Sequence, residues 1–280
     1  MRRATRYNGD MSRLLKQGII GGLYLAVFGA LLWFGYRAVV PAPTCTDGVQ
    51  NGSEDGLDCG VSACGVLCAA PVLPLTVAPA QILSAGSGSD VLVRIDNSNP
   101  LYGASRIEYT LTVSDASGAI IATRRGTTYA NPAQPRYLLF SFPSPLGVGV
   151  SAKLAIDEGS VQWSALTIDA KGDIQFGVRN ELFSPASASI QYQAAVLNRS
   201  KFTFDSVDVI VLVYDQRGTI VGANSTVQRT LASGESRAFS MQWPFAVAGA
   251  TRVEAIISTN VFANDNFIRQ YGAPDAAPGF

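Results

Sequence analysis

Apolar and polar residues alternate over short stretches of the chain beyond residue 71. The clearest examples are residues 107–114 (IEYTLTVS) and 207–214 (VDVIVLVY). A period of two places one face of a strand in a core and the other in solvent. Turn residues follow every eight to twelve positions in this part of the chain. This spacing is typical of a sandwich or barrel, so the pattern predicts an all-β region.

The strand pattern occurs twice, about 100 residues apart. Each alternating run leads into a turn of the same chemistry, DASG at 115–118 and DQRG at 215–218, and a second strand follows. Aspartate at the start and glycine at the end of a four-residue turn suit a type I hairpin connection. Asn97 parallels Asn198, residues 137–142 parallel 237–243, and 152–156 parallel 253–257. We therefore predict two similar β-domains, residues 71–160 and 161–264, followed by a flexible tail at 265–280.

A different pattern precedes them. Residues 18–36 contain no charge, and Pro41 closes an apolar stretch that continues to residue 40. About twenty such residues span a bilayer core, so residues 18–40 are predicted to form a transmembrane helix. A buried core helix and a cleaved signal peptide are the alternatives. The small-residue site at 40–42 is followed by Pro43, a poor position for cleavage, which favours an uncleaved signal anchor.

Charge is distributed unevenly about this helix. Residues 1–17 carry a net charge of +4 and the remainder −4, although the chain as a whole is neutral. By the positive-inside rule, the basic segment 1–17 is predicted to be cytoplasmic and the C-terminal part extracytoplasmic. The sequence thus predicts a single-pass protein of the cell membrane that contacts the lipid bilayer through residues 18–40. No basic stripe remains in the exported part, so nucleic-acid binding is not expected.

All four cysteines lie in the predicted segment 41–70, at Cys45, Cys59, Cys64 and Cys68. Four cysteines in a short exported segment indicate two disulfide bonds. Three pairings are open. The stretch between Cys45 and Cys59 has almost no apolar side chains, so this segment depends on its cross-links to fold.

The same segment is rich in oxygen ligands. Their spacing resembles a twelve-residue calcium loop with a glycine at its sharp turn, and the candidate ligands are Asp47, Asn51, Ser53, Asp55 and Asp58. Val49 breaks the pattern at the third position. The alternative is a disulfide-closed loop in which Asp-Gly and Asn-Gly simply form turns. Apart from calcium, no cofactor is expected.

Two resemblances to known sequences add context. Residues 45–60 resemble the motif C-x-D-G-x-x-N-G-x-E-x-G-x-D-C-G of secreted and surface-anchored proteins, which implies a surface setting. Residues 198–239 resemble FxLYD-type extracytoplasmic domains, whose naming motif appears here as VLVYD at 211–215 with valine in place of phenylalanine. In the first repeat the motif has become LTVSD. The resemblance implies two tandem immunoglobulin-like or fibronectin-like β-sandwiches and carries no catalytic residues.

Catalysis is not expected, because the chain has no histidine and shows neither a nucleophile elbow nor a phosphate-binding glycine loop. We expect a binding or interaction protein whose partner is a protein or a surface glycan. An accessory subunit of a cell-envelope assembly, which engages partners through its sheet edges, is the alternative. Three aromatic residues flanked by Gly, Ser or Pro are predicted to be exposed contacts, namely Tyr102, Tyr129 and Phe183.

Overall fold

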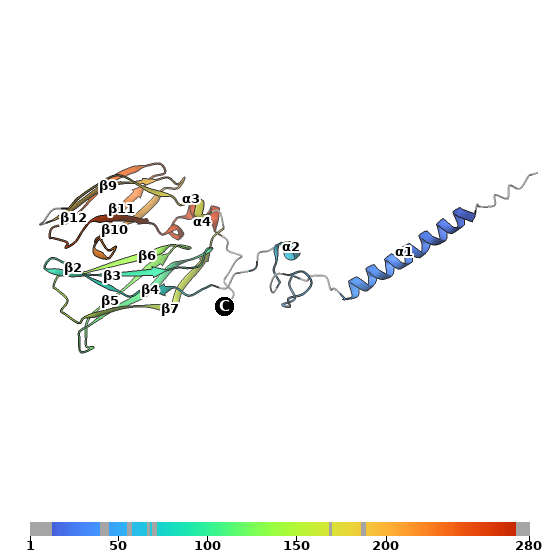
Figure 1. Ribbon diagram of the computed structural model, residues 1–280, viewed down its shortest axis with the longest axis horizontal. Coiled ribbons are helices and arrows are strands. Elements are labelled where there is room, and N and C mark those ends of the chain that lie inside the picture. The colour runs from blue at the N-terminus through green and yellow to red at the C-terminus, as the bar shows by residue number, and fades with distance from the viewer. Residues whose placement is uncertain are drawn as a thin grey trace, which may run out of the picture. The chain divides into compact units, whose positions relative to one another are not determined.

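The computed structural model describes residues 13–39, 45–54, 58–65, 68, 72–167, 170–185 and 189–272. The chain divides into two compact units, residues 1–69 and 70–280, and each is considered by itself. Figure 1 shows the helix of the first unit and the sheets of the second.

The first unit begins with a long apolar helix, α1 (Arg13–Val39). It starts five residues before the predicted span and has 27 residues, or about 40 Å of helix. Residues 15–39 are long and apolar enough to cross a membrane, and none of their most apolar window is buried. A helix that is apolar all round and packs against nothing is the pattern of a membrane span rather than a core helix.

The cysteine-rich segment contains two disulfide bonds, as predicted. Cys45 is bonded to Cys64 and Cys59 to Cys68, so the two closed loops overlap. A single helical turn, α2 (Val61–Cys64), lies between the second and third cysteines and includes the third.

The second unit consists of four antiparallel sheets, stacked as layers in Figure 1. The first sandwich pairs the sheet of β1 (Thr76–Val77), β2 (Gln81–Ala85), β3 (Gly88–Asp96) and β6 (Pro135–Phe142) with the sheet of β4 (Tyr102–Ser114), β5 (Ile120–Ala130) and β7 (Ser151–Ala165). The second pairs the sheet of β8 (Phe176–Pro185), β9 (Ile190–Asn198) and β12 (Ser236–Trp243) with that of β10 (Phe204–Tyr214), β11 (Ile220–Leu231) and β13 (Arg252–Ser258). The predicted fold class is confirmed.

Alternating residues fill the two cores. Leu111 and Val113 of β4 are fully buried in the first core, whereas Thr112 between them is only half-buried. In the second core the largest buried side chain is Trp243, whose indole N–H donates to the Ala223 carbonyl at 3.1 Å. A buried indole needs such a partner, which fixes the position of the ring.

The sequence repeat corresponds to a structural one. The Asp115 and Asp215 carboxylates accept from the backbone N–H two and four residues ahead in both hairpins. Gly118 and Gly218 end these turns with φ values of 86° and 79°, which favour glycine. Just before β4 and β10, the side chains of Asn97 and Asn198 both donate to backbone carbonyls and accept an N–H two residues ahead.

Two boundaries differ from the prediction. β7 continues to Ala165 and pairs with β4 to its end, five residues past the expected limit of the first sandwich. The expected tail begins with a helix, α4 (Asp265–Tyr271), which Asn264 caps by accepting from the Phe267 N–H. Phe267 and Tyr271 are buried in the second core, so a flexible tail from residue 265 is wrong. Residues 273–280 lie outside the described part.

The short helix α3 (Ala170–Asp173) lies between β7 and β8, and the 3-10 turn η1 (Val261–Ala263) lies between β13 and α4. The sandwiches pack through an apolar cluster in which Leu83 and Leu92 of the first meet Ile210 and Leu212 of the second. These side chains project from the outer faces of their sheets, which explains why β10 is apolar on both faces.

Candidate functional site

The predicted contact residues are not the exposed loop aromatics that the sequence suggested. Tyr102 begins β4 with 4% of its surface exposed, and Tyr129 lies in β5 with 8% exposed. Phe183 lies in β8 and packs, half-buried, against the second core. The prediction was wrong for Tyr102 and Tyr129. Small residues next to an aromatic residue occur in loops, but in this protein they also occur where strands pack closely.

Tyr129 joins the two sandwiches. Its hydroxyl donates to the Asp208 carboxylate at 2.8 Å, and the Arg136 guanidinium lies over its ring at 4.2 Å. Arg136 also forms an ion pair with Asp208 at 2.8 Å and donates to the Ser258 hydroxyl at 2.9 Å. Burial raises the pKa of the Tyr129 phenol, and the Arg136 charge partly opposes that rise. The neutral phenol is therefore the form that the junction holds.

Buried asparagines tie the start of the second unit to both sandwiches. The Asn99 side chain accepts from the Leu73 N–H at 2.7 Å and donates to the Leu73 carbonyl at 2.8 Å. It also donates to the Asn97 side chain, which in turn donates to the Asn131 carbonyl. The Asn131 amide donates to the Thr259 carbonyl of the second sandwich at 2.9 Å. The chain that arrives from the first unit is thus attached at one end of the sandwiches.

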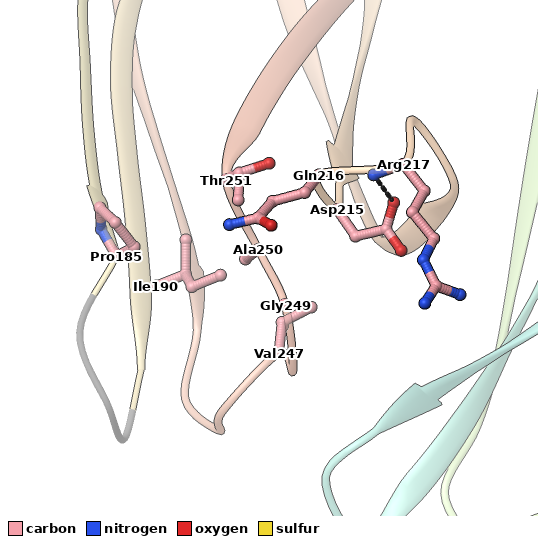
Figure 2. Close-up of a pocket in the computed structure, with 9 residues that line it drawn as sticks. All are labelled: Pro185, Ile190, Asp215, Gln216, Arg217, Val247, Gly249, Ala250 and Thr251. Atoms are coloured by element: carbon pink, nitrogen blue, oxygen red, sulfur yellow. Dashed lines mark hydrogen bonds between the residues drawn. The ribbon is translucent and has the colours of Figure 1, made fainter.

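The opposite end carries a cavity. β13 runs from Arg252, beside this cavity, to Ser258 at the asparagine end, a rise of about 20 Å. The cavity measures about 550 Å³ and is lined by Pro185, Ile190, Asp215, Gln216, Arg217, Val247, Gly249, Ala250 and Thr251. Figure 2 shows the Gln216 amide extending toward Ala250, while the Arg217 side chain points to the other side of the hairpin.

Local hydrogen bonds fix the walls of this cavity. The Asp215 carboxylate accepts from the Arg217 N–H at 2.9 Å. This bond holds the hairpin turn in place and occupies one oxygen of the carboxylate. The Thr251 N–H donates to the Tyr214 carbonyl at 2.8 Å, which joins the loop before β13 to the hairpin. Ile190 and Val247 give the cavity an apolar wall. The result is a preformed surface with an apolar wall and an exposed Gln216 amide at its rim, which suits ligand contact.

The proposed calcium ligands make turn contacts. The Asp58 carboxylate accepts from the Asp47 and Gly48 N–H groups at 3.0 and 2.8 Å, and the Asn51 amide donates to the Asp47 carboxylate at 2.9 Å. Ser53 is exposed, and Asp55 lies outside the described residues. These bonds use some carboxylate lone pairs and leave calcium binding a prediction.

Glu54 is an acidic residue that the ligand pattern missed. Its carboxylate is buried, accepts from the Asn51 N–H at 3.1 Å, and lies near the sulfurs of Cys45 and Cys64. Those sulfurs form a disulfide and are not thiolate ligands, so this group does not form a thiolate metal site.

No family model matches the chain, and no curated protein matches it. Among solved structures it is similar to red sea bream transglutaminase, at 10% identity over 71% of this chain and 30% of that one, with a TM-score of 0.24. It is also similar to the calcium binding domain CBD12 of CALX1.1, at 13% identity over 60% of this chain and 72% of that one, with a TM-score of 0.18. The chain spans about three tenths of the transglutaminase. At these scores neither likeness bears on function.

Proposed function

We propose that this chain is a membrane-anchored, non-enzymatic binding protein that presents a ligand-contacting surface at the end of its sandwiches opposite the one where Asn99 binds Leu73. The observation that carries the proposal is that the second unit has two different ends. Asn99 holds the incoming chain at one end, and the cavity beside Gln216 lies at the other. The segment that enters the second unit at Leu73 therefore does not line this cavity.

The proposed orientation has a cytoplasmic N-terminus and an extracytoplasmic second unit, with α1 as an uncleaved signal anchor. The +4 charge of residues 1–17 and the two disulfide bonds support this orientation, because disulfides persist in oxidising compartments. A reporter enzyme that is active only outside the cytoplasm, fused after residue 272, should be active. An inactive fusion, with an active one placed before residue 13, would reverse the orientation.

Ligand binding is tested with the full-length chain in nanodiscs on arrays of surface glycans and of extracellular peptides. Gln216→Trp fills the cavity, so we expect it to abolish any array signal that depends on this end. Ser117→Trp is the matched control, because Ser117 lies at the exposed tip of the corresponding hairpin in the first sandwich. Equal binding by Gln216→Trp and the original chain would reject this cavity as the ligand surface.

A second role, as an accessory subunit that pairs its sheet edges with partner proteins, is favoured by one strand. β7 is the longest strand in the described part of the chain, and it is an edge strand of its sheet. Natural proteins usually shorten, charge or cover such edges. Crosslinking in native membranes separates the two roles, because recovery of the chain alone would count against a subunit.

A further inference from the structure

β7 has a free edge along part of its length. Among the described residues it pairs with β4 on one side only, and the sheet order β5-β4-β7 places no second strand on its other side. Glu108 pairs with Asp157 and Arg106 with Gln162, so residues 158–161 bulge out of the ladder. The strand resumes from Gln162 to Ala165.

Hydrogen bonds at its end establish which groups face outward. The Leu166 N–H donates to the Leu101 carbonyl at 2.8 Å, on the β4 side, whereas the Thr167 N–H donates to the Tyr271 carbonyl at 2.8 Å on the other side. Because successive N–H groups of a strand alternate in direction, Trp163 and Ala165 direct theirs away from β4. An antiparallel bridge between Leu166 and Gly272 occupies this side just past the end of β7, so the open stretch of the edge lies before that point.

An apolar groove lies beside the same edge. Its volume is about 360 Å³, and its walls include Leu75 and Val77 from the start of the unit, with Ile156, Val161 and Trp163 from β7. These five side chains are all half-buried. Among the residues that line the groove, Glu158 carries the only charge, and Asp157 beside it is also exposed.

We propose that the free edge of β7 binds an extended segment of a partner protein, antiparallel to β7, with alternate apolar side chains in the groove and a basic residue near Glu158. This proposal rests on the proposed interaction role and names the partner's chemistry. Unpaired backbone groups give affinity, and the groove selects side chains at every second position. The adjacent carboxylates of Asp157 and Glu158 select the basic residue by charge complementarity.

Geometry predicts which partner N–H groups matter. The Trp163 side chain lines the groove, and its N–H points to the free edge. A partner residue directly opposite Trp163 shares its face and directs its own N–H toward β7. Groove-facing residues of the partner are therefore the hydrogen-bond donors, and the residues between them are not.

The probe is the fluorescent peptide Lys-Val-Thr-Val-Thr-Val-Lys, titrated into the full-length chain in nanodiscs with anisotropy as the readout. N-methylation of its valines should weaken binding by roughly sevenfold or more, because each of the two bonds lost opposite Trp163 and Ala165 contributes about one RT or more. N-methylation of its threonines should leave binding within about twofold, because those N–H groups face solvent. Equal losses from both modifications would overturn strand pairing in favour of nonspecific apolar contact.

Charge reversal tests the second element of the proposal. Glu158→Lys should lower the affinity for the probe several-fold, and the effect should shrink at high salt. Asp205→Lys is the matched control, since this exposed acid lies in the second sandwich. Equal effects of the two variants would refute selection by the groove, and so would no effect of either.

Two further outcomes identify other occupants. A chain that ends at Gly272 and binds the probe much more tightly would show that residues 273–280 compete for the edge, which overturns a partner as the occupant. Probe binding that falls as the chain is concentrated, together with dimers in sedimentation, would assign the edge to a second copy. If Gln216→Trp loses array binding but still binds the probe, the β7 edge and the cavity beside Gln216 are two independent binding sites.

Discussion

Replacing Asn198 by alanine should destabilise the second sandwich more than any other single polar change considered. Its side chain is fully buried and donates to the carbonyls of Phe202, Leu231 and Ala232 at 2.7, 3.2 and 3.1 Å. Its carboxamide oxygen accepts the Ser200 N–H at 3.0 Å and the Ser200 hydroxyl at 2.6 Å. The substitution leaves several of these groups buried without a partner.

The magnitude follows from the number of groups affected. A buried group without its partner costs about 1–3 kcal/mol, and such losses are not additive within one network. The Phe202 carbonyl also accepts from the Ser200 hydroxyl, so it keeps one partner after the substitution. We therefore expect a loss of about 3–4 kcal/mol in the free energy of unfolding. For a unit of this size the midpoint should fall by roughly 6–15 °C.

Calorimetry of the full-length chain in detergent measures this shift. Asn224→Ala is the matched control, since both hydrogen bonds of the Asn224 side chain are exposed: it donates to the Gln242 carbonyl at 3.1 Å and accepts from the Ser225 N–H at 2.8 Å. The control should lose about 0.5 kcal/mol or less. A loss below about 1 kcal/mol in Asn198→Ala would show that water or neighbouring groups replace the network, and the reasoning would fail.

Three other predictions concern pH and calcium. The Asp115 pKa is lowered by the Ser117 hydroxyl and by backbone N–H groups, so this carboxylate stabilises the fold above its ordinary pKa of 3.8, and the stabilisation disappears as pH falls through the lowered value. In Ser117→Ala the melting temperature should therefore fall less steeply as the pH is lowered below 3.8. The same pH dependence of the melting temperature in both proteins would contradict this. Burial and the Glu254 carboxylate raise the Tyr214 pKa to about 12, so its contribution is complete below pH 10 and is lost as pH rises through 12. In an ultraviolet titration, Tyr214→Phe should lack one of the tyrosines that ionise near pH 12. If the tyrosine missing from the variant's titration is one that ionises near pH 10, the raised pKa of Tyr214 is refuted. Calcium should raise the melting temperature of the full chain, Asp58→Asn should abolish the rise, and identical melts with calcium and chelator would end the metal hypothesis.

The repeated strands could be predicted because their signals are local. Alternation at 107–114 and 207–214 and the paired turns at Asp115 and Asp215 depend on residues that are neighbours in sequence. The apolar helix is local in the same sense. Overlap of the disulfide loops could not be predicted, because all three pairings close loops of modest length.

The failures all involve contacts between distant residues. Tyr129 is buried because Asp208, 79 residues away in sequence, meets it across the sandwich junction. Residues 265–271 form a helix because Phe267 and Tyr271 find a place in the second core. The signal for this helix was present in Asn264 as a cap, although seven residues are too few for a helix that stands alone. The cavity beside Gln216 likewise combines residues from three connections that are distant in sequence, β8–β9, β10–β11 and β12–β13.

The overlapping disulfides have a consequence for proteolysis of the segment between α1 and the sandwiches. Every peptide bond between Cys45 and Cys68 lies within at least one of the two closed loops, Cys45–Cys64 or Cys59–Cys68. A protease that cuts this segment once therefore leaves the sandwiches covalently joined to the anchor. Release by cuts within this segment requires a reductant together with the protease, or three cuts, one between each pair of successive cysteines, which makes the segment a tether that tolerates nicking.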